Sequence, residues 1–283
     1  METQIVAAKI KTTIYGAVAT ALFALAAANC PAKLYVDIEA DQTTVVTNDA
    51  YLRCGAKDFK LGVKHDVGLN VFLPVVTTNQ SLEGHQKSFY FQMTAHSGNH
   101  TPGEKMFIDV ATINDAYGAK FGRTNTLGFA VRLARGFEPP DKNLMLSEWW
   151  QGSPYGPPLE LFIKPGTTQW QLACGNGVKT TTAIPGNTLE TDKWYFFTIS
   201  VAPNLDPKKG WVQVWQDGKL VIDRSGIPIG YDPEHPLDPK YGRPLRAFYV
   251  EAGLYRPAQP RQASAYFDSI RWGDTFEDVQ SKP

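Results

Sequence analysis

Apolar and polar residues alternate along one short segment after another from residue 88 onward. In segment 88–96, Phe89, Phe91 and Met93 alternate with polar residues, and segment 247–256 repeats the pattern. Successive side chains of a strand point to opposite faces of a sheet, so each segment predicts a strand with one buried face. Further strands are expected at 105–113, 127–134, 144–150, 159–164, 169–173, 193–201 and 264–272. This pattern predicts an all-β fold of two packed antiparallel sheets.

The clearest single element is a hairpin over residues 210–223. Two β-rich runs flank Asp217-Gly218 there, and Asp-Gly between such runs is the strongest short-range hairpin signal. The 20 Pro and 24 Gly residues also fit many strands joined by turns better than a helical chain. No segment of 33–283 carries an apolar stripe of helical period over three turns, so no long helix is expected.

Composition narrows the class of protein. The 28 Lys+Arg residues balance 28 Asp+Glu residues, which argues against a nucleic-acid partner, because phosphate contacts need a basic surplus. A hydrophobic fraction of 43% with 20% charged residues is typical of a globular core. The length of 283 residues suits a single all-β domain.

The first 28 residues predict a secretory signal peptide. Two lysines precede an uncharged, mostly apolar stretch over 12–28, which is short for a membrane span and ends in Ala26-Ala27-Ala28, a cleavage signal. Cys30-Pro31-Ala32 offers a second cleavage site, and an N-terminal membrane anchor is the alternative interpretation. We therefore expect a secreted, extracellular protein with a mature domain over 33–283, no membrane contact beyond the signal segment, and a monomeric state.

The cysteines leave two options open. Cys54 and Cys174 remain in any mature form, either as one disulfide or as two free buried thiols. The sequence contains no Cys-x-x-Cys or His-Glu-x-x-His pattern, so we predict no metal site of that kind.

The polar faces of the expected strands carry groups suited to carbohydrate. If these faces belong to one concave sheet, it presents Tyr, Gln, His, Arg, Lys and carboxylates. Aromatic rings stack on sugar rings, and long polar groups bind hydroxyls and carboxylates. An ordinary solvated sheet face is the alternative.

A family resemblance enters at the C-terminal strands. Segments 247–256 (AFYVEAGLYR) and 265–274 (AYFDSIRWGD) resemble polysaccharide lyases of the heparin lyase I and glucuronan lyase type. The first is also similar to the Y-F-K-A-G-x-Y segment of jelly-roll alginate lyases. Upstream of them, further segments resemble the same family and occur in its order. They are 128–133, 139–140, 146–151, 156–161, 193–195 and 210–219. The resemblance covers roughly residues 88–279.

This resemblance implies a concanavalin A-like β-jelly-roll sandwich that cleaves a uronic-acid polysaccharide by β-elimination. Such a lyase masks the substrate carboxylate, removes the C5 proton and protonates the leaving oxygen. Tyr255 matches the motif tyrosine and is the expected acid, and Gln151 is the expected carboxylate neutraliser, with Glu148 as a weaker candidate. The expected base is His96 or His100. The partner is an anionic polysaccharide, no organic cofactor is needed, and a calcium ion (Ca2+) is allowed although no Asp-rich loop demands one.

Further side chains are candidates for substrate binding. Arg132, Lys164 and Arg256 are the expected cations, and Trp150 and Tyr249 are the expected aromatic contacts. Solvent-facing strand charges are the alternative for the three cations. Trp149 is expected in the core.

Some motif positions differ from the family pattern. Glu148-Trp149-Trp150 stands where the family often has Gln-Trp-His, and Glu251 stands where alginate lyases have Lys. No Arg-x-Glu-Leu pattern is evident. These differences keep a non-catalytic, lectin-like jelly roll as the alternative function. The Glu-x-Asp-x-x-Glu pattern of sandwich glucanases is absent from the sequence, which argues against glycoside hydrolysis.

Overall fold

The computed structural model divides the chain into two compact units, residues 1–33 and 34–283. It describes 34–46, 51–54, 57–64, 75–78, 80–93, 104–111, 118–152, 155–176, 182–235, 240, 242–257 and 259–280, all in the second unit. The predicted signal peptide lies outside the described residues. Within those ranges, no helix has the length and hydropathy needed to cross a membrane.

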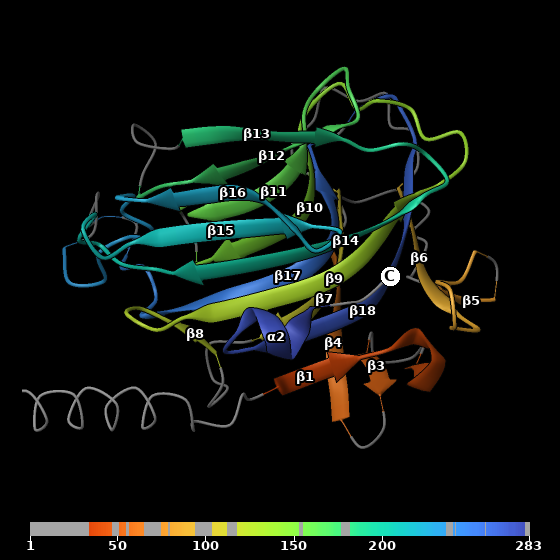
Figure 1. The fold of residues 1–283 in the computed structure, drawn as a ribbon, viewed down its shortest axis with the longest axis horizontal. Helices are drawn as coiled ribbons and strands as arrows, with labels where there is room; N and C mark the ends of the chain where they lie inside the picture. Colours follow the sequence, from red (N-terminus) through yellow and green to blue (C-terminus); the bar gives the residue numbers. More distant parts are fainter. Residues whose placement is uncertain are drawn as a thin grey trace, which may run out of the picture. The chain divides into compact units, whose positions relative to one another are not determined.

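Two antiparallel sheets make up the second unit, as Figure 1 shows. The first sheet has the order β16-β15-β14-β9-β18-β6-β5, with β1 also paired to β18. Its strands are β1 (Leu34–Ile38), β5 (Val75–Thr77), β6 (Ser88–Met93), β9 (Asn125–Leu133), β14 (Trp194–Ala202), β15 (Trp211–Gln216), β16 (Lys219–Ser225) and β18 (Ala263–Gly273).

The second sheet has the order β13-β12-β11-β10-β17-β7-β4-β3-β2, with β8 also paired to β17. Its strands are β2 (Thr43–Val46), β3 (Tyr51–Cys54), β4 (Lys57–Lys64), β7 (Glu104–Ala111), β8 (Ala119–Lys120), β10 (Leu144–Trp150), β11 (Leu159–Ile163), β12 (Gln169–Cys174), β13 (Thr182–Thr188) and β17 (Ala247–Arg256). Strands β10 and β17 are neighbours although about 100 residues separate them along the chain.

The core lies between the inner faces of the two sheets. Phe129 and Phe197 of the first sheet stack with their ring centroids 5.6 Å apart, and Trp149 of the second meets Trp272 of the first edge to face at 5.3 Å. All four rings are at most 1% exposed. Burial of this aromatic and aliphatic surface is the main force that holds the sheets together. The expected core position of Trp149 is confirmed.

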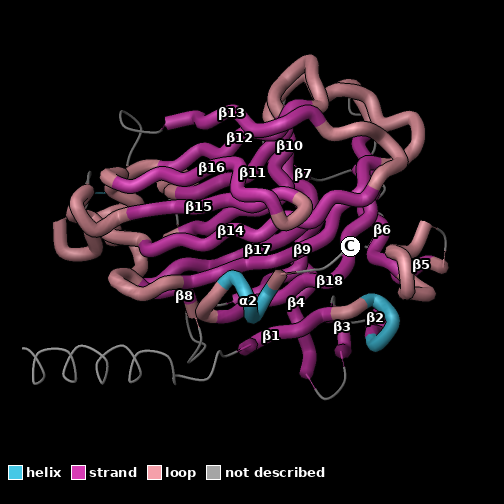
Figure 2. Tube along the Cα trace, in the orientation of Figure 1, coloured by secondary structure: helices cyan, strands magenta, loops and turns pink. Residues whose placement is uncertain are grey.

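Two short helical segments complete the described structure, as the colours of Figure 2 show. They are η1 (Ala40–Gln42), which follows β1, and α2 (Phe276–Val279), which follows β18. Thr275 caps α2 by a capping box, in which its hydroxyl accepts from the Asp278 amide and the Asp278 carboxylate accepts from the Thr275 amide.

The all-β prediction and the jelly-roll class are confirmed. The hairpin falls where the Asp-Gly signal placed it, and Asp217 and Gly218 have φ values of 53° and 75°, as a tight two-residue turn requires. Strand β13 was not expected, because Pro185 interrupts its sequence. It lies at the edge of the second sheet, where a proline is tolerated.

The structure also chooses between the two options for the cysteines. Cys174 is a buried free thiol, and burial raises its pKa to about 11. The disulfide alternative is therefore not adopted, and a thiol this hard to ionise is a poor nucleophile.

Candidate functional site

The outer face of the second sheet brings several predicted site residues together. Strand β10 carries Glu148 and Trp150, and its neighbour β17 carries Tyr249 and Tyr255. Trp150 is the register partner of Tyr249, and their rings lie 5.9 Å apart at a tilt of 32°. Both rings are part-exposed and form one aromatic platform on this face.

Four carboxyl groups cross the same face in one line. The register pairs Asp109 on β7 with Glu251 on β17, Glu251 with Glu148 on β10, and Glu148 with Glu160 on β11. Asp109, Glu251 and Glu148 are 9%, 6% and 5% exposed. We call these four residues the acidic row. Like charges opposite each other weaken a sheet, so the row costs stability.

The acidic row holds a carboxyl group that titrates near neutral pH. Burial, together with the neighbouring Glu148 carboxylate, raises the pKa of Glu160 to about 7. Burial disfavours the charged form, and a nearby negative charge disfavours it further. A carboxyl group with such a pKa can hold or release a proton under ordinary conditions, which is what acid–base chemistry requires.

Tyr255 lies beside the acidic row, next to a small pocket. Its side chain is half-buried and packs against Met145 and Phe162. The pocket, which is about 10 Å³, is lined by Tyr255 and by two residues of the row, Glu148 and Glu251. Gly253 has a φ of 151° and no side chain, so it leaves this space open. Met145 and Ser147 also line the pocket, and a bulge in β10 between them shifts the register with β17.

Positively charged residues continue the line of Tyr255. Its register partner on β7 is Lys105, and the partner of Lys105 on β4 is Lys64. Their side chains are outside the described ones, so only their positions in the sheet are given. Sequence reasoning missed both lysines and most of the acidic row, because the alternation within a strand does not tell which strands are neighbours.

Gln151 has a structural task instead of the predicted one. It is fully buried, its Oε1 accepts from the Tyr231 amide at 2.6 Å, and its Nε2 donates to the carbonyl oxygens of Leu245 (2.8 Å) and Tyr231 (3.2 Å). These bonds use both amide hydrogens. The geometry therefore corrects the predicted role of Gln151, which holds two loops in place and offers no amide to a substrate.

Two of the predicted cations are also placed elsewhere. Arg256 is fully buried, and its Nη1 donates to the Arg261 carbonyl, which ties β17 to the turn before β18. Arg132 lies on β9 of the first sheet, where its Nη2 pairs with Asp192. Neither guanidinium lies on the face of Tyr255, so neither can contact a substrate that is bound on that face.

The remaining predicted residues divide into two groups. Lys164 is exposed and directly follows β11, at the end of the face that carries Glu160. Its predicted contact with substrate stays a prediction. His96 and His100 lie outside the described residues. The expectation that one of them is the base stays a prediction.

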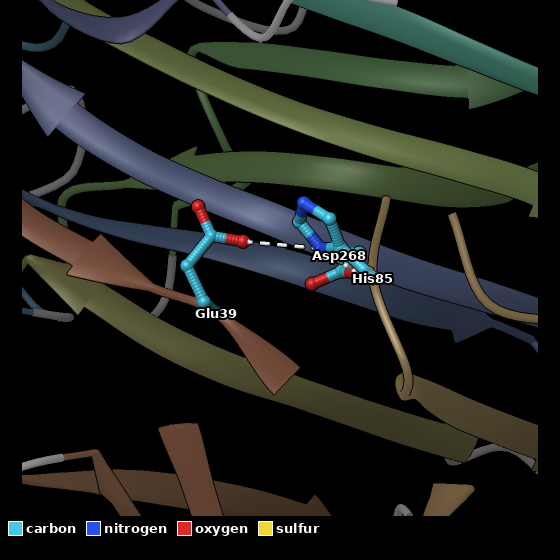
Figure 3. A group of neighbouring side chains, drawn as sticks. All are labelled: Glu39, His85 and Asp268. Carbon is cyan, nitrogen blue, oxygen red and sulfur yellow. Dashed lines mark hydrogen bonds and ion pairs between the residues drawn. The ribbon is translucent and has the colours of Figure 1, made fainter. Parts of the chain in front are cut away.

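One group among the described residues has the side chains of a metal site. Glu39, His85 and Asp268 come from three distant segments and point toward one another, as Figure 3 shows. His85 Nδ1 is 2.8 Å from Asp268 Oδ2 and 3.6 Å from Glu39 Oε2. We call this group the Glu39 cluster. It lies on the first sheet, on β18 and the segments next to β1 and β6.

Hydrogen bonds already satisfy the Glu39 cluster. Asp268 Oδ1 accepts from the backbone amides of Ala40 and Ser269, at 3.1 and 2.8 Å. Glu39 accepts from the Ser269 hydroxyl at 3.0 Å and from the Arg271 guanidinium at 2.8 Å. Burial raises the pKa values of Asp268 and Glu39 above their ordinary values in spite of these donors. These bonds hold residues 39 and 40 against β18. A cation bound at the cluster would be repelled by the Arg271 guanidinium.

Comparison with known proteins adds a family and a fold. A family model described as polysaccharide lyase matches residues 75–271. Among solved structures, the chain is similar to the endo-β-1,4-glucuronan lyase from the fungus Trichoderma reesei, with 14% identity, 86% of this chain and 98% of that chain covered, and a TM-score of 0.58. It also matches the marine PL-14 alginate lyase from Aplysia kurodai, with 11% identity, 70% and 86% coverage, and a TM-score of 0.47. No curated protein sequence matches.

Proposed function

The chain belongs to the polysaccharide lyase family, whose model covers more than half of it, and from this premise we propose a reaction and a site. The proposed reaction is β-elimination on a uronic-acid-containing polysaccharide at the outer face of the second sheet. One observation carries the proposal. Tyr255, the acidic row and the platform of Trp150 and Tyr249 share one face of neighbouring strands.

In the proposed step, a base removes the proton on C5 of a uronate ring and the C4–O4 bond breaks. A C4=C5 double bond forms, and the O4 leaving group takes a proton from an acid. We assign the acid to Tyr255, because its side chain is part-exposed, lines one pocket with Glu148 and Glu251, and has Lys105 as its register partner. An acid must lie within hydrogen-bond reach of the atom it protonates, which a residue on this face can do. The base stays with His96 or His100.

The acidic row would supply carboxylate neutralisation. A group with a pKa of about 7 is protonated in much of the population near neutral pH, so Glu160 can donate a hydrogen bond. A protonated carboxyl beside Glu148 can mask the charge of the substrate carboxylate and stabilise the enolate-like transition state. Trp150 and Tyr249 would stack on the neighbouring sugar. In this proposal, Glu160 replaces Gln151 as neutraliser.

A non-catalytic, lectin-like function is the second candidate. The acidic row favours it, because ionised carboxylates on this face would repel a polyuronate and leave a site for another sugar. The same residues then bind without chemistry, and the Tyr255 hydroxyl has no part in turnover.

Secretion and a monomeric state belong to the same proposal. The uncharged stretch over 12–28 supports export of the chain, and polymeric substrates are too large to enter a cell.

The test uses purified protein that lacks residues 1–28, with glucuronan, alginate and heparin as separate substrates. Elimination creates a conjugated double bond that absorbs in the ultraviolet, whereas hydrolysis or binding does not. A rise on any polymer supports the lyase reaction and names the substrate. Flat traces with retained binding to one polymer favour the lectin-like function, and flat traces without binding overturn both.

A further inference from the structure

The predicted hairpin presents a second set of aromatic side chains, far from Tyr255. Trp211, Gln213 and Trp215 alternate along β15 with the buried Val212 and Val214. The three longer side chains are part-exposed on the outer face of the first sheet. Tryptophan is among the largest apolar side chains, so its exposure to water is unfavourable. Two part-exposed tryptophans on one strand therefore indicate a binding surface.

These side chains line a groove of about 590 Å³. The segment 274–277, which leads into α2, forms the opposite wall, and the Phe276 ring lies 4.6 Å from the Trp215 ring. Arg123, in the turn between β8 and β9, also lines the groove. Figure 1 shows α2 beside β9 and β18 on this face. We call this feature the tryptophan groove.

The groove combines stacking surfaces with hydrogen-bonding groups. Four residues separate the two indoles along β15, which corresponds to about 13 Å along a strand. Gln213 lies between them, and its register partner Ser200, which is 4% exposed, lines the groove beside it. The negatively charged face of an indole attracts the C–H groups of a pyranose ring, while amides and hydroxyls bind its hydroxyl groups. The spacing suits an oligosaccharide that bridges both rings.

The charges in the groove select against an acidic sugar. Arg123 is the cation that lines it, and its Nη2 is already 3.6 Å from Asp274 Oδ1. Glu277 lines the groove as well, and Asp223 accepts a hydrogen bond from Gln213 at 3.1 Å. A uronate carboxylate would meet more negative than positive charge here, so an uncharged sugar is favoured.

We propose that the tryptophan groove binds an uncharged pyranose oligosaccharide. The two indoles stack on two of its rings, and the Gln213 amide binds its hydroxyl groups. The groove is on the sheet opposite the proposed reaction face and would hold the enzyme on a neutral polysaccharide that accompanies its substrate. Binding needs no turnover, so this proposal can fail or succeed independently of the lyase reaction.

The test measures binding of cellohexaose by isothermal titration calorimetry to protein lacking residues 1–28. The matched variants are Trp211→Ala, Trp211→Phe and Leu220→Ala. Leu220 is 41% exposed on the same hairpin and does not line the groove, so Leu220→Ala is the control. Thermal unfolding of each variant shows whether it folds. Trp211 is chosen over Trp215, because loss of Trp215 would also remove the contact that supports Phe276.

Cellohexaose is expected to bind the wild type and Leu220→Ala alike, while Trp211→Ala weakens binding at least tenfold and Trp211→Phe restores part of it. A glucuronan oligosaccharide of the same length should bind this groove at least tenfold more weakly. Three outcomes would overturn the proposal. These are no cellohexaose binding, binding that Trp211→Ala leaves intact, and a glucuronan oligosaccharide that binds the groove more tightly than cellohexaose.

Discussion

The outer faces of the two sheets differ in how their charged side chains are arranged. On the first sheet, charged groups are neutralised in pairs, as in Arg132 with Asp192 and Arg271 with Glu39. On the second sheet, the acidic row brings four carboxyl groups next to one another, and the pKa of Glu160 rises to about 7. Paired charges stabilise a fold, whereas crowded like charges cost stability and recur where chemistry is done. This crowding agrees with the placement of the proposed reaction on the face that the acidic row shares with Tyr255.

The strongest test of this contrast is the phenol of Tyr255. Tyr255→Phe keeps the ring that packs on Met145 and removes only the hydroxyl. If Tyr255 is the acid, turnover should fall by about 10² to 10⁴-fold while polymer binding stays nearly unchanged. Ultraviolet absorbance measures the first and calorimetry the second.

Tyr266→Phe is the matched control for this variant. Tyr266 is half-buried on the outer face of the first sheet, where its ring stacks on Tyr90 at 4.9 Å. Its activity should equal that of the wild type. Equal activity of Tyr255→Phe and Tyr266→Phe would remove Tyr255 from the mechanism.

The second test disrupts the paired charges of the first sheet. Asp268→Ala removes the acceptor that His85 and two backbone amides share in the Glu39 cluster. Loss of one partner from a buried charged network should lower the free energy of unfolding by about 3 to 5 kcal/mol. Urea unfolding measures this loss. Lys193→Ala breaks the exposed pair of Lys193 with Glu190 and should leave stability unchanged. An equal loss in both variants would contradict the stabilising role of the Glu39 cluster.

The third test uses pH to probe the acidic row. The pKa of Glu160 is raised in the folded state, so the folded protein holds its proton longer than the unfolded chain does. Its contribution is therefore full below pH 4.5 and is lost as pH rises toward 7. Glu160→Gln cannot ionise and should be more stable than the wild type at pH 8, by about 1 to 3 kcal/mol, with little difference at pH 4.

Urea unfolding at both pH values checks this prediction. Glu190→Gln is the control, because Glu190 is an exposed carboxylate with a side chain 72% accessible. A stabilisation by Glu160→Gln that is the same at pH 4 and pH 8 would contradict the titration of Glu160.

The smallest expected effect concerns calcium. The oxygens of the Glu39 cluster already accept hydrogen bonds, and Arg271 occupies its cationic position. Addition of Ca2+ or of a chelator should therefore leave the unfolding temperature nearly unchanged. Ligand binding stabilises a folded state in proportion to the logarithm of ligand concentration, so a rise that grows with Ca2+ would reveal a cation site. Repeating the titration with Asp268→Ala would assign that site to the cluster.

Local pattern was enough to predict the all-β fold class, whereas the candidate site residues came from the family resemblance and stay predictions. The alternation in 88–93 and 247–256 gave the correct buried faces, and Asp217-Gly218 marked the hairpin. The alternation predicts Tyr249 and Tyr255 on the outward face of their strand, and Glu148 and Trp150 join that face through the bulge in β10 and the register. Gln151 and Arg256 were read as substrate contacts because their residue types suit a uronate. Burial and backbone hydrogen bonds show other tasks, which residue type alone cannot reveal.

Which face a residue takes and where a chain turns were determined by the sequence itself, because both follow from a period of two and from the conformations of neighbouring residues. Which residues become neighbours across the sheet was decided by the tertiary structure. Asp109, Glu251, Glu148 and Glu160 form a row only through the order and register of β7, β17, β10 and β11. Strand order and register are set by packing over long sequence distances, and the raised pKa of Glu160 depends on both.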